Sequence, residues 1–280
     1  MKIKNKFSRA ALFLLLSVLA VVFLVPILLV VLNSFKGKFD IVSAPFALPT
    51  AQTFIGLDNY INGAKAAGFF GAFIRSLWIT VGSVAVIVLF SAMTAWFITR
   101  SKMKFCRVIY YALVFSMIVP FQMVMYTLTY VVGRIHFNNL LGIIFVYLGF
   151  GAGLSVFMIS GFVRSIPLDI EQAAMIDGCT PITTFFEVIL PILKPTLITV
   201  AILNAMWIWN DYLLPYLILG TDKNKTIPVA VQITMQGAYG AVDWGGFMAM
   251  LVLAIFPIVV FYLFCQKYII SGVLAGAVKG

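Results

Sequence analysis

Six stretches of mainly apolar residues, each long enough to cross a lipid bilayer, constrain this chain more than any other feature. A transmembrane helix needs about 20 such residues to cover about 30 Å of hydrocarbon. Only 10% of the residues are charged, whereas a soluble domain usually carries about 25%. The sequence therefore predicts an all-α integral membrane protein with six spans, at 10–33, 73–99, 108–132, 141–163, 196–219 and 246–267.

The first span follows a basic head, as the core of a signal peptide does. Its apolar run, 10–32, exceeds the roughly 7–15 residues of a signal core, and no small-residue cleavage site follows it. We therefore expect an uncleaved transmembrane helix. The predicted domains are a cytoplasmic segment 1–9, a six-span region 10–267 and a cytoplasmic tail 268–280.

The basic residues indicate how the spans are oriented. The formal net charge is +10, but no basic stripe typical of nucleic-acid binding occurs, so we predict no nucleic-acid partner. With six crossings, twelve Lys and Arg residues lie on the side of both termini and seven on the other. Since cytoplasmic links carry the excess of basic residues, both termini are predicted in the cytoplasm.

The predicted cytoplasmic loop 164–195 is unusually polar for this chain. Pro167 suits a first helical turn, and Asp169 and Glu171 place negative charge near the start of the helix, where the helix dipole favours it. Gly178 is suited to ending that helix in a left-handed turn. These features predict one short helix that ends at Gly178.

A second helix is predicted to follow directly. Thr180 and Pro181 fit the N-cap and first helical positions, and Pro191 and Pro195 are expected to break the chain. Neither short helix is stable alone in water. The loop is therefore either an interfacial connector on the lipid headgroups or a surface for a partner.

This loop resembles the EAA loop of permease subunits in ATP-binding-cassette importers. The resemblance rests on an E-x-A-x-x-x-D-G pattern and a following F-x-x-x-x-L-P-x-x-x-P pattern. It implies a coupling helix seated in a cleft of a cytoplasmic ATPase subunit, with a partner arginine bound by Glu171 or Asp177. The docking residues implied are Glu171, Ala173, Ala174, Asp177, Gly178 and Phe185.

Further motifs resemble the six-span, maltose-type half of carbohydrate importers. They are PFALP (45–49), NY (59–60), WNDYLLP (209–215), TIPVAV (226–231) and AGAVKG (275–280). The chain departs from the pattern at Arg75, where the family commonly has asparagine, and at Cys179, where it usually has alanine. The resemblance implies four kinds of partner: a homologous second permease subunit, two ATPase subunits, an extracellular sugar-binding protein that contacts the external segments 36–72 and 220–246, and membrane lipid.

The chain contains no phosphate-binding loop of the G-x-x-x-x-G-K-[ST] type. We therefore expect no ATP hydrolysis by this chain, no catalytic or metal-binding residues, and no cofactor. The alternative is an ion-coupled secondary transporter or channel for a small polar solute. Such carriers usually bury several ionisable residues in their spans, and here only Asp211 qualifies.

The predicted translocation path combines aromatic and amide groups, which suit sugar binding. Trp207 shares a helical face with Asn210 and Asp211 at i+3 and i+4 spacing. Gln122 and Tyr126 form a second polar stripe, four residues apart. Two other interpretations stay open: Trp and Tyr often anchor span ends at the interface, and Asn and Asp can bond between helices.

Overall fold

A computed structural model of the chain describes residues 6–235 and 242–277. Within these residues the secondary structure is helical, apart from an isolated β-bridge between Lys36 and Phe54. The chain divides into two compact units: Met1–Phe70 with Ala230–Pro257, and Gly71–Val229 with Ile258–Gly280. The predicted helical fold class is confirmed.

The first unit holds α1 (Lys6–Asn33), α2 (Lys38–Ser43) and α3 (Asp58–Ala67), together with the later part of α12 (Ile227–Thr234) and the beginning of α13 (Trp244–Ala277). The Asn59-Tyr60 motif closes the end of α1. The Asn59 side-chain amide donates to the carbonyl oxygens of Ser34 and Lys36 at 2.8 and 2.9 Å, and the Tyr60 and Ser34 hydroxyls lie 2.6 Å apart. These bonds hold the chain just after α1 against the beginning of α3.

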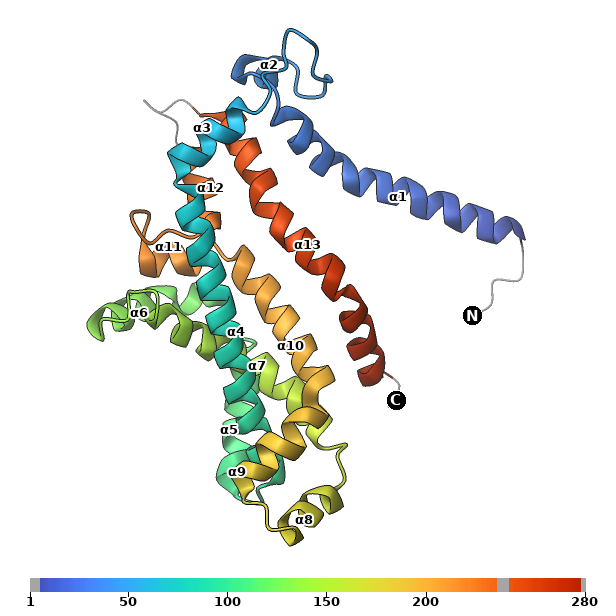
Figure 1. Cartoon of the computed structure of the whole chain (residues 1–280), viewed down its shortest axis with the longest axis vertical. Helices are drawn as coiled ribbons and strands as arrows, with labels where there is room; N and C mark the ends of the chain where they lie inside the picture. Colours follow the sequence, from blue (N-terminus) through green and yellow to red (C-terminus); the bar gives the residue numbers. More distant parts are fainter. Residues whose placement is uncertain (1–5, 236–241, 278–280) are drawn as a thin grey trace. The chain divides into compact units, whose positions relative to one another are not determined.

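The second unit holds the remaining helices: α4 (Phe69–Arg100), α5 (Lys104–Ser116), α6 (Phe121–Arg134), α7 (Gly142–Val163), α8 (Leu168–Ile176), α9 (Pro181–Thr183), α10 (Leu190–Asn210) and α11 (Leu213–Leu219). Within it, α7 packs against both α5 and α10 (Figure 1). Small residues permit this packing: a Cβ on Gly151 of α7 would lie 2.6 Å from Ile87 and 2.8 Å from the Asn204 side-chain oxygen. Close approach at small residues is how helices associate in lipid.

Two apolar clusters lie inside the second unit. One joins α4, α7 and the start of the fifth span, with Ala92, Val156, Ile159, Phe185 and Leu193 among its buried members. The other surrounds Tyr147 of α7 and includes residues of α4, α6, α10 and α11. The described residues contain five helices long and apolar enough to cross a membrane, or six crossings if the bent pair of α5 and α6 counts as one.

The third predicted span, 108–132, is wrong as a continuous helix. α5 and α6 are bent by 109°, and the break falls at Met117–Pro120, where Pro120 has an extended backbone with ψ 136°. Proline provides no N–H for the preceding turn, so the two arms end and begin there.

The fifth predicted span, 196–219, is wrong at both ends. The apolar helix that the structure offers as a span is Pro181–Asn210, and α11 is a separate helix after Asp211 and Tyr212. The Asp211 carboxylate accepts the backbone N–H groups of Leu213 and Leu214 at 3.0 and 3.4 Å. A side chain that caps a new helix in this way ends the previous one.

Candidate functional site

The loop after α7 forms its first helix as the sequence predicts. α8 spans Leu168–Ile176, and Gly178 adopts a left-handed backbone with φ 88°. The N–H of Cys179 donates to the carbonyl of Ala174 at 2.9 Å, and that of Gly178 to the carbonyl of Met175 at 3.1 Å. This pair of bonds is a Schellman motif, which needs a residue that tolerates positive φ.

The second helix starts as predicted but does not stop. Thr180 caps it by accepting the N–H of Thr183 at 3.2 Å, with Pro181 in the first turn. The helix then continues through a π-helical segment, Thr184–Ile189, into α10. The prediction that Pro191 and Pro195 break the chain is therefore wrong.

Packing accounts for the continuity at these prolines. A proline inside a helix costs about 3 kcal/mol, but Ile189 and Leu193, which flank Pro191, are completely buried in the first apolar cluster. Helices in membranes tolerate proline because neighbouring helices and local π-helical adjustments satisfy the freed backbone groups, and the π-helical segment Thr184–Ile189 lies just before Pro191. The loop is consequently joined to the fifth span without an interruption.

Glu171 binds partners within the chain. Its carboxylate accepts Nη2 and Nε of Arg100 at 2.7 Å each, and Nε1 of Trp96 at 3.1 Å. Arg100 also donates to the carbonyl oxygen of Ile166 at 2.9 Å. With 4% of its surface exposed, Glu171 ties α8 to the end of α4, rather than presenting its carboxylate to a partner arginine.

The other predicted docking residues divide between two faces. Ala174 and Phe185 are buried, and Phe185 lies against the Trp96 ring at 5.5 Å between centroids. Ala173, Asp177 and Gly178 are exposed. The neighbouring Ile176 is 86% exposed, so the outer face of α8 joins an apolar side chain to a carboxylate and a glycine.

A second group of predicted residues gathers where α10 ends. The Tyr147 hydroxyl donates to the Asp211 carboxylate at 2.9 Å, and the Tyr147 and Trp207 rings meet edge to face at 5.5 Å. The Asn210 side chain donates to the carbonyl of Met206, one turn back on its own helix. Trp209 points to a neighbouring helix instead, against Phe73 of α4.

Asp211 lies one residue beyond the span that ends at Asn210. Burial raises the pKa of its carboxyl group, while the hydrogen bonds from Tyr147, Leu214 and Leu213 act in the opposite direction. Both carboxylate oxygens are therefore used in holding the junction of α10, α11 and α7.

Gln122 and Tyr126 are exposed on one side of α6, while Phe121 and Leu128 on another side pack around the cluster of Tyr147. Within the part of the chain that the structure describes, no hydrogen bond or ring contact joins Gln122 or Tyr126 to Trp207, Asn210 or Asp211. The structure thus brings one of the two predicted polar groups together and leaves the other apart.

Several residues in these contacts were not predicted. Arg100 was predicted only to be one of the basic residues on the cytoplasmic side, and no prediction concerned Trp96. Tyr147 could have been found from the sequence, because a tyrosine in an apolar span usually needs a hydrogen-bond partner for its hydroxyl group. Arg75, where the chain departs from the family pattern, also forms a contact. Its Nε donates to the carbonyl of Lys225 at 2.9 Å. Next to this bond, the N–H of Ile227 donates to the Ser76 hydroxyl.

Comparison with known families decides what these features belong to. Residues 87–274 match the family model described as binding-protein-dependent transport system inner membrane component. The chain belongs to this family.

Members of the binding-protein-dependent transport family resemble the chain over its whole length. The chain is 39% identical, over 94% of each sequence, to the probable starch degradation products transport system permease protein AmyC of Thermoanaerobacterium thermosulfurigenes. It is 37% identical, over the full length of both, to the multiple sugar-binding transport system permease protein MsmG of Streptococcus mutans.

A solved structure shares the fold. With a TM-score of 0.78 and 21% identity, the chain resembles a protein in the crystal structure of a bacterial ABC transporter involved in the import of the acidic polysaccharide alginate. The match covers 96% of this chain and 99% of that one.

Proposed function

We propose that this chain is the permease subunit of an ATP-binding-cassette importer for sugars in a bacterial inner membrane. Membership of the transport family supports this, as do two relatives whose names refer to starch degradation products and to multiple sugars. The ion-coupled alternative gains no support from Asp211, because its two carboxylate oxygens bind Tyr147, Leu213 and Leu214.

The proposal for coupling rests on one observation: one face of α8 is bonded to α4, and the opposite face is exposed. Glu171 fixes it through Arg100 and Trp96, while Ile176 and Asp177 remain exposed. Several large apolar side chains of this loop are exposed, among them Met175, Ile176 and Ile182, which suits a surface that a partner covers. We therefore assign Ala173, Asp177 and Gly178 to the contact with an ATPase subunit, and Glu171, Ala174 and Phe185 to positioning the loop.

The complex in this proposal contains a second, homologous permease, two ATPase subunits and an extracellular sugar-binding protein. Both termini of this chain lie in the cytoplasm, and lipid surrounds its spans. Closure of the ATPase dimer moves the loop, and the continuous helix Pro181–Asn210 transmits the movement to Trp207 and Asp211. The translocation path then opens to the other side of the membrane.

Photocrosslinking tests the docking surface. A benzoylphenylalanine placed at Ile176 is expected to form a covalent adduct with the ATPase subunit in membranes that contain the whole importer. The same group at Ile135, which is also exposed and is predicted on the other side of the membrane, serves as the matched control. Adducts from Ile176 that stay within this chain would contradict the proposal.

A further inference from the structure

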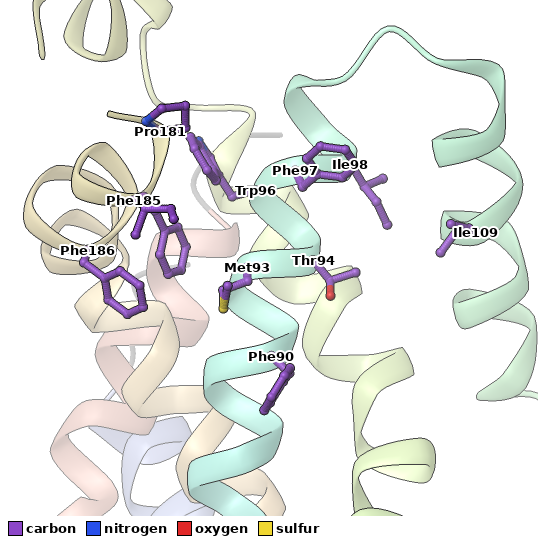
Figure 2. Close-up of a pocket in the computed structure, with 11 residues that line it drawn as sticks. Phe90, Met93, Thr94, Trp96, Phe97, Ile98, Ile109, Pro181, Phe185 and Phe186 are labelled. Atoms are coloured by element: carbon purple, nitrogen blue, oxygen red, sulfur yellow. The ribbon is translucent and has the colours of Figure 1, made fainter. Parts of the chain in front are cut away.

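An apolar cavity of about 560 Å³ lies beside the loop, between α4, α5 and the beginning of the fifth span. Figure 2 shows Phe90, Met93 and Phe97 of α4, Ile109 of α5, and Phe185 and Phe186 around it. The side chains around it are almost entirely hydrocarbon or aromatic. From Phe90 to Ile98 the helix rises by about 12 Å, so the cavity extends along the span rather than across it.

Basic residues stand at one end of this cavity. Ile98 and Ile109 line it, the link between their helices carries Lys102, and the first turn of α5 carries Lys104 and Arg107. All three basic side chains are exposed, and within the described residues none of them forms an ion pair. An apolar slot that ends in positive charge is complementary to a molecule with an apolar tail and an anionic head.

We infer that this cavity is a binding site for an anionic phospholipid. One acyl chain lies in the cavity along α4, and the headgroup phosphate lies among Lys102, Lys104 and Arg107. Basic residues at a membrane surface attract anionic lipids, whereas a zwitterionic lipid lacks the net charge that this end of the cavity complements.

The site shares side chains with the contacts that hold the loop. Trp96 and Phe185 line the cavity; Trp96 also donates to Glu171, and its ring packs on Phe185. A bound acyl chain therefore touches Trp96, one of the two side chains that fix α8 to α4. Lipid binding by this cavity is independent of the proposed transport function.

Lipid retention by the purified, complete importer tests the site directly. The importer is placed in nanodiscs that contain equal amounts of phosphatidylglycerol and phosphatidylcholine, then released and examined by native mass spectrometry. We expect phosphatidylglycerol to be retained in preference, with Lys102→Glu lowering the retention by at least about fivefold, because one basic residue near an anionic lipid contributes about that much and the substitution also adds a negative charge. Lys223→Glu, the same charge change at an exposed lysine predicted on the opposite side, is expected to change nothing.

Filling the cavity provides a second test. Met93→Trp is expected to remove the retained phosphatidylglycerol, whereas Val81→Trp, at another exposed position of α4, leaves it bound. Equal retention of the two lipids, or unchanged retention in Met93→Trp, would overturn the inference. So would a photocrosslink from Phe90 that captures the second permease instead of lipid, because protein would then occupy the cavity.

Discussion

Glu171 shows how one residue of a docking motif is used inside its own chain. The carboxylate is buried and bonded to Arg100 and Trp96. A buried carboxylate is costly unless it is paired, so loss of the arginine leaves an uncompensated charge where α8 meets α4. Arg100 is thus a positioning residue for the docking surface.

Arg100→Gln is expected to loosen α8. The loss of stability is about 2 kcal/mol, below the usual range for breaking a buried pair, because the Arg100 side chain is 18% exposed. Maleimide labelling of Cys179, in a background without Cys106 and Cys265, measures the change and should become faster. Arg134→Gln, at an exposed arginine of α6, is the control; equal labelling of the two variants would show that the pair does not hold the loop.

Asp211 combines two roles that substitutions can separate. Its Oδ1 caps α11 and its Oδ2 accepts the Tyr147 hydroxyl. Asparagine retains a capping oxygen and alanine does not, so Asp211→Ala should lower stability by about 1 kcal/mol more than Asp211→Asn. The thermal midpoint of the purified protein measures both variants, and equal midpoints would exclude the capping role.

The bond to Tyr147 requires a separate measurement. Tyr147→Phe removes the donor and is expected to cost about 1.5 kcal/mol. In a double-mutant cycle with Asp211→Ala, the two losses should not add, since they remove the same contact. Uptake of labelled sugar by Asp211→Asn is a further readout, and unchanged uptake would exclude any essential role of the Asp211 charge in transport.

At the scale of elements, local chemistry predicted the turn that ends α8 and the start of the next helix, but not where that next helix ends. Gly178, Thr180 and Pro181 carry turn and cap signals, and the structure confirms the turn and the cap. Pro191 and Pro195 carry an equally strong break signal, but packing against neighbouring helices and the π-helical segment before Pro191 compensate for it. A contact with residues distant in sequence decides that outcome, so no local pattern contains it.

The backbone at Gly178 gives a prediction for coupling. A side chain at φ 88° costs about 1–2 kcal/mol, but asparagine tolerates this region. Gly178→Val should therefore abolish the ATPase activity that substrate stimulates, while the variant still inserts into the membrane. Gly178→Asn separates strain from volume: it relieves the strain but fills the outer face, where a Cβ meets nothing within 4 Å in this chain.

The assay for these variants is ATP hydrolysis by the reconstituted importer, with the amount of inserted permease measured in parallel. If Gly178→Asn is also uncoupled, volume at the partner contact is the cause; if it is active, the left-handed turn is. Normal coupling by Gly178→Val would contradict both explanations.

For the whole molecule, two main features were predicted from the sequence: the number of apolar helices and the family to which the protein belongs. Five long apolar helices and one bent pair match the six predicted stretches, because composition over about 20 residues is a strong signal. The 109° bend was not predictable, although Pro120 marked its position. Each arm of the bent pair is only about 20 Å long, shorter than the hydrocarbon layer.

The orientation therefore depends on whether the bent pair crosses the membrane. If it crosses, the links around Ser101 and Asn138 lie on opposite sides; if it re-enters, they lie on the same side. We expect Asn138→Cys to react with a membrane-impermeant maleimide in intact cells and Ser101→Cys to react only after the cells are opened. Reaction of both from outside, or of neither, would show that the pair does not cross.

The unbroken helix from Pro181 to Asn210 also fixes a mechanical ratio. Asn204, which packs against Gly151 and donates to Ser155 of α7 at 3.2 Å, lies about 35 Å from one end of this helix and about 9 Å from the other. If the helix is rigid and pivots at that contact, a displacement of its Pro181 end produces a displacement of Asn210 that is about four times smaller and opposite in direction. Under that condition, a large movement of the loop would become a small movement near Trp207.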